Sequence, residues 1–203
     1  MPSAGYSDRI NHALAFAAKH HDRQVHKGTR APYGTHAANV AIILTRYDCD
    51  DETVISGILQ DVVADCVNER YSREMLDQRI GQKFGAEVLE SVLSITLLRA
   101  DEDGVDLSHD ERRADLLDRL QHANDRARWV LAADALHAVG ATLANLRRTI
   151  DADSVWSQLP MGKEGTARWY RAMCERFRAI GFSAPIVDEL ARSVDELSRR
   201  ASA

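Results

Sequence analysis

The chain has 203 residues, of which 45% are hydrophobic and 28% are charged, and its formal net charge at pH 7 is -5. A chain of this length and composition can bury a core without disulfides or a structural metal ion. Its mild acidity argues against a nucleic acid or an anionic membrane surface as partner, because neither is attracted by a negative net charge.

The first half of the chain carries apolar residues with a helical period. Ser7 and Asp8 form a cap region that opens a helix from Arg9 to about Gln24, and breakers from His26 to Pro32 predict a loop. Four further helices are predicted at residues 35–47, around 54–63, from Ser72 to a stop at Gly81, and from Phe84-Gly85 to about 95.

The second half begins with an acidic loop, after which Ser108 caps a helix predicted at 110–124. Residues 129–146 are the most apolar segment and predict a central buried helix. Two amphipathic helices, at 166–180 and 184–198, follow a loop with a short helical turn near Trp156. No alternating strand pattern occurs, so the predicted fold is an all-α, compact helical bundle. We expect a single domain over 1–203, with a core at 7–150 and a helical extension at 151–203.

The cysteines and the N-terminus predict a cytoplasmic protein. Cys49, Cys66 and Cys174 are far apart, odd in number and without metal-ligand spacing, which favours reduced thiols. The N-terminal residues are polar and offer no apolar stretch for a signal peptide, and no window is apolar for long enough to predict a membrane span.

Two carboxylates interrupt apolar helices. Gln60-Asp61 lies within the run from Val54 to Val63, and Asp134 lies within the most apolar helix. A buried carboxylate is costly unless it meets a cationic partner, a metal ion or water, so either each one is paired structurally or the two belong to one site on facing helices. His36 follows a Pro32-Tyr33-Gly34 turn that leads into a helix. One imidazole and two carboxylates form a ligand set suited to Mn²⁺ or Mg²⁺.

A set of short segments follows a characteristic order along residues 7–200. They are Phe16-Ala17-Ala18, His21, Gln24, Lys27-Gly28-Thr29, Pro32-Tyr33, His36, Val40-Ala41, Ile58 to Asp65, Phe84-Gly85, Thr96, Ala133 to Ala138, Trp156, Gly162 to Thr166, and Trp169-Tyr170-Arg171. This ordered set resembles the HD-domain hydrolases of the RelA/SpoT alarmone type. The resemblance implies an all-α fold of the HD superfamily and Mn²⁺-dependent removal of the 3′-diphosphate from (p)ppGpp.

The same resemblance implies a metal site of two His and two Asp. His36, Asp61 and Asp134 occupy three of these positions, and Gln60 stands at the fourth, where the family has His. The family's Glu next to Asp65 is replaced by Ala64, which leaves Asp65 as the catalytic candidate. Ala135 and Ala138 stand at the positions of the family's Lys and Asn.

These substitutions at the metal and catalytic positions lower the hydrolase activity that we expect. A Gln offers a weaker ligand than a neutral imidazole, and loss of a positioned general base costs roughly 10²–10⁴-fold in rate. The first hypothesis is therefore a degenerate (p)ppGpp-hydrolase-like protein with weak or no hydrolysis that retains binding of a purine nucleotide or a protein partner. The alternative is an active metal-dependent phosphohydrolase that releases diphosphate or phosphate from (p)ppGpp or a related nucleotide. A third is a scaffold role.

Two groups of residues are candidates for substrate binding. Arg23, His26 and Lys27 precede the turn before His36, where the resembled hydrolases meet phosphates, although a solvated loop explains them equally well. Lys163 and Tyr170 lie in the C-terminal part and would supply a cation and a stacking ring, although aromatic residues at helical spacing more often belong to a core.

Overall fold

The computed structural model describes residues 7–22, 24–25, 32–67, 70–100, 103 and 105–202. These residues form ten α-helices, and they include an isolated β-bridge between Ala100 and Asp106. The prediction of an all-α fold is confirmed.

The chain divides into two compact units within α7 (Asp125–Arg148). The first unit runs through Leu131, and the second begins at Ala132 and includes Val25. The division lies inside a helix rather than near residue 150, where the sequence suggested the start of an extension. The expectation of a single domain stays a prediction.

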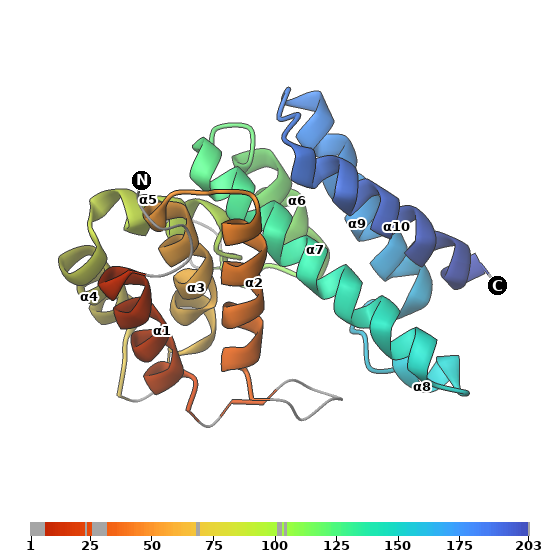
Figure 1. Cartoon of the computed structure of the whole chain (residues 1–203), viewed down its shortest axis with the longest axis horizontal. Helices are drawn as coiled ribbons and strands as arrows, with labels where there is room; N and C mark the ends of the chain where they lie inside the picture. The colour runs from red at the N-terminus through yellow and green to blue at the C-terminus, as the bar shows by residue number, and fades with distance from the viewer. Residues whose placement is uncertain are drawn as a thin grey trace. The chain divides into compact units, whose positions relative to one another are not determined.

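Helix α3 (Asp51–Asp65) is the centre of the first unit. It packs against α1 (Asp8–His20), α2 (Gly34–Arg46), α4 (Arg73–Phe84) and α5 (Ala86–Ile95), and α6 (His109–Arg119) in turn packs against α5 (Figure 1). Residues 53–60, 62 and 63 of α3 are all buried, so this helix is enclosed on nearly every side. That enclosure is why its apolar run is almost continuous and why any polar side chain within it needs a specific partner.

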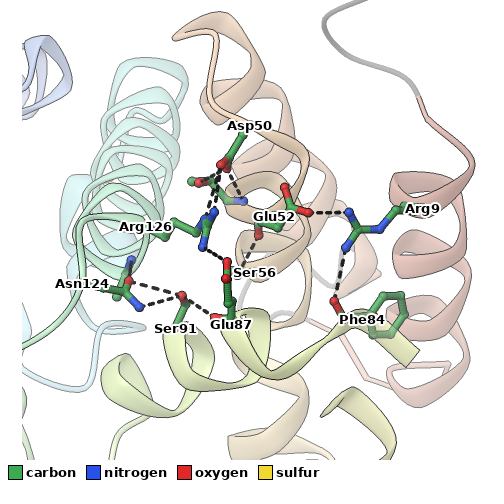
Figure 2. Close-up of polar contacts among 11 residues, drawn as sticks. Arg9, Asp50, Glu52, Ser56, Phe84, Glu87, Ser91, Asn124 and Arg126 are labelled. Atoms are coloured by element: carbon green, nitrogen blue, oxygen red, sulfur yellow. Dashed lines mark hydrogen bonds and ion pairs between the residues drawn. The ribbon is translucent and has the colours of Figure 1, made fainter. Parts of the chain in front are cut away.

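Exposed ion pairs surround the N-terminal end of α3. The Asp50 carboxylate accepts a hydrogen bond from the Thr53 backbone N–H at 2.9 Å and pairs with Arg126 at 3.2 Å. Arg126 also pairs with Glu87 at 2.6 Å, and Arg9 pairs with Glu52 (Figure 2). These contacts connect α3 to α1, to α5 and to the start of α7.

Helices α2 and α3 approach closely at Gly57. A Cβ atom at this position would lie 2.5 Å from Cδ1 of Leu44 and 3.0 Å from Cγ1 of Val40. The missing side chain therefore lets the backbones come near each other one turn before Gln60 and Asp61.

The second unit contains the rest of α7, α8 (Ala152–Trp156), α9 (Gly162–Ala179) and α10 (Pro185–Ser202). Helices α9 and α10 lie side by side (Figure 1). The buried residues of α10 recur at helical spacing: Ile186, Val187, Leu190, Val194, Leu197 and Ala201. Amphipathic packing therefore explains this pair of helices, as the sequence predicted.

Several helix boundaries differ from the predictions: α1 ends at His20 instead of about Gln24, α6 at Arg119 instead of residue 124, and α10 at Ser202 instead of residue 198. Three other boundaries also differ. Helix α4 continues through Gly81 to Phe84, and the chain leaves it at Gly85 with a φ of 104°, a conformation that favours glycine. Helix α7 begins at Asp125, because the Asn124 side chain accepts a hydrogen bond from the Ala127 backbone N–H at 2.9 Å and caps it. Helix α9 begins at Gly162 instead of Thr166.

Helix α7 also corrects the expectation that no segment is apolar for long enough to span a membrane. Of the residues that the structure describes, its 24 form the one helix whose length and composition would suffice. Half of its apolar window is buried inside the protein, and the core helix of a soluble protein has the same composition. Its many alanine and leucine residues account for both properties.

Candidate functional site

The candidate site of the first unit begins at the start of α2, which carries His36. The chain enters this helix through a turn in which the Tyr33 backbone N–H donates to the Gln24 carbonyl at 3.0 Å. The Thr35 hydroxyl and the Thr35 backbone N–H both donate to the Pro32 carbonyl, at 2.8 and 3.0 Å. These bonds fix the first turn of α2, and His36 on that turn is 6% exposed.

His36 meets two residues from the C-terminal half of α3. Its Nε2 atom lies 3.3 Å from Oδ2 of Asp61 and 3.3 Å from the amide nitrogen of Gln60. Gln60 is 7% exposed, whereas the Asp61 side chain is 28% exposed. The structure therefore brings together the predicted ligands His36 and Asp61, and it places the substituted residue Gln60 beside them.

Tyr33 joins the two carboxylates of this helix end. Its hydroxyl lies 3.0 Å from Oδ2 of Asp61 and 3.0 Å from Oδ2 of Asp65. Burial raises the pKa of Tyr33, and the negative charges of Asp61 and Asp65 raise it further, so the phenol remains a proton donor at neutral pH. The single phenolic proton of Tyr33 is therefore shared between the carboxylates of Asp61 and Asp65, which lie about one helical turn apart.

His21 and Gln24 support this arrangement from the end of α1. The His21 ring stacks on Tyr33, with ring centroids 4.6 Å apart, and its Nδ1 lies 2.6 Å from Oε1 of Gln24. The Gln24 amide group donates to the Asp65 carbonyl at 2.8 Å, so Oε1 is the atom that accepts from the Nδ1–H of His21. Burial lowers the pKa of His21, which keeps this imidazole neutral.

Two further contacts lie at the same end of α3. Arg99 donates to the Ala64 carbonyl at 3.0 Å, so that Arg99 and Gln24 together satisfy the last two carbonyls of the helix. The Cys66 sulfur lies 3.4 Å from Nδ1 of His21, and burial raises the pKa of its thiol to about 12. Cys66 is therefore a thiol at neutral pH and packs beneath the site.

The remaining predicted site residues belong to the second unit or lie outside the described residues. Asp134, on α7, and Lys163 and Tyr170, both on α9, belong to the second unit. Lys163 is exposed and Tyr170 is half-buried. Arg23, His26 and Lys27 lie outside the described residues. The roles predicted for these six residues stay predictions.

A divalent metal ion needs several oxygen or nitrogen ligands close together. Among the described residues, no group of three His, Cys, Asp or Glu side chains is placed to hold a metal ion. Two ligand atoms that lie about 2.1 Å from one ion and at right angles to each other are about 3 Å apart. The 3.3 Å from His36 Nε2 to Asp61 Oδ2 is close to that spacing, and the Gln60 amide lies equally near the imidazole. His36 and Asp61 thus fit as neighbouring ligands, whereas the Gln60 atom in contact with the imidazole is its amide nitrogen, which does not bind a cation.

Sequence reasoning assigned no site role to Tyr33, His21, Gln24 or Arg99. Tyr33 precedes His36 by three residues and carries a polar atom into the turn before α2, which is a signal that was available. Contacts of Gln24 and Arg99 with the end of α3 join residues 41 and 35 positions apart, and no sequence spacing predicts them.

The comparisons with known proteins identify the family. A family model described as HD domain matches residues 13–163, which is more than half of the chain. The chain therefore belongs to the HD domain family. The resemblance to its RelA/SpoT-type members is confirmed.

Two curated relatives each match about half of this chain. A GTP pyrophosphokinase of Myxococcus xanthus is 29% identical over 108 residues, which are 53% of this chain and 13% of the relative. A guanosine-3′,5′-bis(diphosphate) 3′-pyrophosphohydrolase of Aquifex aeolicus (strain VF5) is 31% identical over 91 residues, which are 45% of this chain and 12% of the relative. The matched segments thus span a small part of these much longer proteins.

Two solved structures share the fold. The crystal structure of lmo0812 from Listeria monocytogenes EGD-e superposes with a TM-score of 0.64 at 27% identity, covering 82% of this chain and 98% of that one. A metazoan ortholog of SpoT, described as hydrolysing ppGpp, superposes with a TM-score of 0.69 at 21% identity over 96% of both chains. At that identity the second likeness supports the fold alone.

Proposed function

We propose that this chain is a (p)ppGpp-hydrolase-like protein with weak or no hydrolase activity that retains the binding of a purine nucleotide. The observation that carries the proposal is the last turn and a half of α3. Gln60 contacts His36 where a second imidazole is expected, and Ala64 offers a methyl group where a carboxylate base is expected.

The chemistry of these side chains supports the proposal. A methyl group accepts no proton, so Asp65 is the carboxylate that remains next to this position. Oδ2 of Asp65 already accepts a hydrogen bond from the Tyr33 hydroxyl at 3.0 Å, so one of its two oxygens is occupied. Loss of a positioned base lowers the rate of hydrolysis by about 10²–10⁴-fold.

A divalent ion fits the proposal as cofactor, with Mn²⁺ or Mg²⁺ as candidates. His36 and Asp61 would hold it, together with Asp134 as predicted from the sequence. The ion would supply Lewis-acid polarisation of a phosphate oxygen and a lowered pKa for water. The protein's own groups would orient these atoms: Tyr33 fixes the Asp61 oxygen, and the first turn of α2 fixes the imidazole.

The relatives support a guanosine polyphosphate as the ligand class. The Aquifex aeolicus relative is named for removal of the 3′-diphosphate from guanosine-3′,5′-bis(diphosphate). Lys163 and Tyr170 are the candidates for contact with the nucleotide within the described residues, and Arg23, His26 and Lys27 are the candidates outside them. Binding to a partner protein and a cytoplasmic location also remain proposals.

A second candidate function is an active metal-dependent phosphohydrolase. The observation in its favour is that His36, Asp61 and Asp65 are connected through contacts of 3.0 to 3.3 Å. If Tyr33 donates its proton to Asp61, the Asp65 carboxylate is left as a base one turn away.

The test is turnover of ppGpp with Mn²⁺, measured as released diphosphate, alongside ppGpp binding measured by calorimetry. We expect the wild-type protein to bind ppGpp with slow or undetectable turnover. The double variant Gln60→His/Ala64→Glu should raise turnover by at least about 10²-fold, because it restores an imidazole ligand and a base.

The matched control is Gln60→His/Ala64→Gln, which adds a side chain of the same size at residue 64 without a basic carboxylate. It should stay near the wild-type rate. Wild-type turnover equal to that of the Gln60→His/Ala64→Glu variant would support the second candidate function, and the absence of ppGpp binding would contradict both.

A further inference from the structure

An arginine lies at the same end of α3 as the candidate site. Arg99 follows α5, and its guanidinium donates to the Ala64 carbonyl at 3.0 Å. Ala64 stands where the resembled family has its carboxylate base, and it directly precedes Asp65. This contact therefore places a positive charge beside the catalytic position and about one helical turn from Asp61.

The backbone that carries Arg99 is anchored on both sides. Before it, the Arg119 guanidinium donates to the Thr96 carbonyl at 2.8 Å, which ties the end of α5 to the end of α6. At residue 99 itself, the Arg99 carbonyl accepts a hydrogen bond from the Leu107 backbone N–H at 2.9 Å. The side chain is thus held at its base by the backbone and at its tip by the Ala64 carbonyl.

The charge of Arg99 is unmatched within the part of the chain that the structure describes. There its guanidinium has the Ala64 carbonyl as acceptor and forms no ion pair, and the residue is exposed. A guanidinium has five N–H groups, and the planar fork of those that remain suits two oxygens of a phosphate. By contrast, Arg9 also donates to a last helix carbonyl, that of Phe84 at 3.3 Å, but pairs with Glu52 (Figure 2).

A phosphate at this end of α3 needs such a cation. The Asp61 and Asp65 carboxylates and the negative end of the helix dipole would repel it. The divalent ion expected at His36 and Asp61 offsets part of this repulsion, and Arg99 adds a further positive charge. In a hydrolase of this kind the diphosphate to be removed lies against the metal ion and the base, so it is the group nearest to residues 64 and 65.

We propose that Arg99 binds the 3′-diphosphate of the nucleotide through its guanidinium and so sets the preference of the site for ppGpp over GDP. The Ala64 carbonyl keeps the side chain in position for this contact. This inference deepens the proposed function and rests on it for the identity of the nucleotide.

The test measures the binding of ppGpp, GDP and inorganic diphosphate to the full chain by calorimetry, with Mn²⁺ present. The Arg99→Gln variant should bind ppGpp and inorganic diphosphate about 10–100-fold more weakly than the wild type, while its GDP affinity changes less than about threefold. The Arg99→Lys variant keeps the charge and loses the planar fork, so its ppGpp affinity should lie between those of the wild type and Arg99→Gln.

The matched control is Arg9→Gln, which removes the same charge from an exposed arginine that also donates to the last carbonyl of a helix. This variant should bind all three ligands as the wild type does. Circular dichroism and thermal unfolding show whether each variant is folded, and the Arg99→Lys result decides the matter if Arg99→Gln does not fold.

Three results would overturn the proposal: unchanged ppGpp affinity in a folded Arg99→Gln variant, an equal loss in Arg9→Gln, or an equal loss for GDP. A wild type that binds inorganic diphosphate through Arg99 but does not bind ppGpp would contradict the proposed function and leave the phosphate-binding role of Arg99 standing. A wild type that binds neither ligand would contradict both.

Discussion

The two ends of helix α3 carry similar numbers of acidic residues, but the carboxylates at the two ends have different kinds of partner. At the N-terminal end, Asp50 and Glu52 pair with Arg126 and Arg9 (Figure 2). At the C-terminal end, the described contacts of the Asp61 and Asp65 carboxylates run to the neutral Tyr33 hydroxyl and, for Asp61, to His36. At the N-terminal end the carboxylates pair with guanidinium groups, whereas at the C-terminal end they contact a phenol and an imidazole.

The helix dipole makes this difference stronger. Carboxylates are stabilised near the N-terminus of a helix and destabilised near its C-terminus, by about 0.3–1 kcal/mol each when exposed. Arg9 lowers the pKa of Glu52, and at Asp50 the hydrogen bonds from Thr53 and the Arg126 guanidinium outweigh burial and also lower its pKa. The carboxylates at the N-terminal end of α3 therefore stabilise the fold, whereas those at its C-terminal end are unfavourable for the stability of the helix. Carboxylates placed in this way are typical of functional sites.

The largest effect is expected midway between these ends, at Gly57. The Gly57→Val variant would force atoms against Leu44 and Val40, which lie within 3.0 Å of an added Cβ, and would move α2 with His36 away from α3. We expect the free energy of unfolding, measured in urea, to fall by about 2–3 kcal/mol. The control is Gly140→Ala, a helical glycine with nothing within 4 Å of an added Cβ, which should gain about 0.5–1 kcal/mol. Equal effects of both variants would refute the close approach.

The next largest effect is expected at the N-terminal end. The Asp50→Ala variant removes both the helix cap and the partner of Arg126, and it should lower the free energy of unfolding by about 1–2 kcal/mol. Asp50→Asn keeps a capping oxygen and should lose only a few tenths of a kcal/mol, since exposed ion pairs contribute little. If the two variants behave alike, charge rather than capping stabilises this end.

A smaller effect of opposite sign is expected at the C-terminal end. The Asp65→Asn variant keeps an oxygen for the Tyr33 hydroxyl and removes a negative charge from the last residue of α3. The free energy of unfolding should rise by about 0.3–1 kcal/mol at low ionic strength, and Asp65→Glu should give no gain. A loss of stability in Asp65→Asn would break the contrast between the ends.

The smallest effect on the free energy of unfolding at neutral pH is expected at His20. In mild acid this residue should contribute a pH dependence of stability. This imidazole packs between Phe16 and Tyr71, and its Nδ1 is buried without a hydrogen-bond partner. Burial lowers the pKa of His20, and Arg79 on α4, Lys19 and His21 lower it further. Below about pH 6.5 the unfolded chain binds a proton that the folded chain binds less well, so stability falls as the pH drops from about 6.5 toward the folded pKa.

Unfolding of the His20→Phe variant in urea between pH 7.5 and 5 measures this effect. The substitution keeps an aromatic ring and should flatten the pH dependence, with the remaining slope due to His21, whose pKa is also lowered. The His109→Gln variant, at an exposed position, is the control and should follow the wild type. The N-terminal carboxylates sharpen the comparison, because their lowered pKa values place their loss of stability below about pH 4.

The accuracy of the sequence predictions differs between backbone and side chains. The helical class and the centre of every helix followed from apolar periodicity, and the proximity of His36 and Asp61 followed from the resemblance. Boundaries at Asn124 and Gly162 were misplaced, because one depends on a side-chain cap and the other on a turn. The predicted role of Asp134 stays untested, since it lies in the other compact unit.

By itself the sequence determined which segments are helices and which polar residues stand where an apolar core would exclude them. Periodicity and composition are local properties of the chain, so they locate each helix but leave its ends uncertain by several residues. Only the tertiary structure decided that one phenol serves two carboxylates, that a glutamine amide faces an imidazole, and that α3 is acidic against its own dipole. These features depend on distances of about 3 Å between residues from different helices, which packing sets and sequence spacing does not.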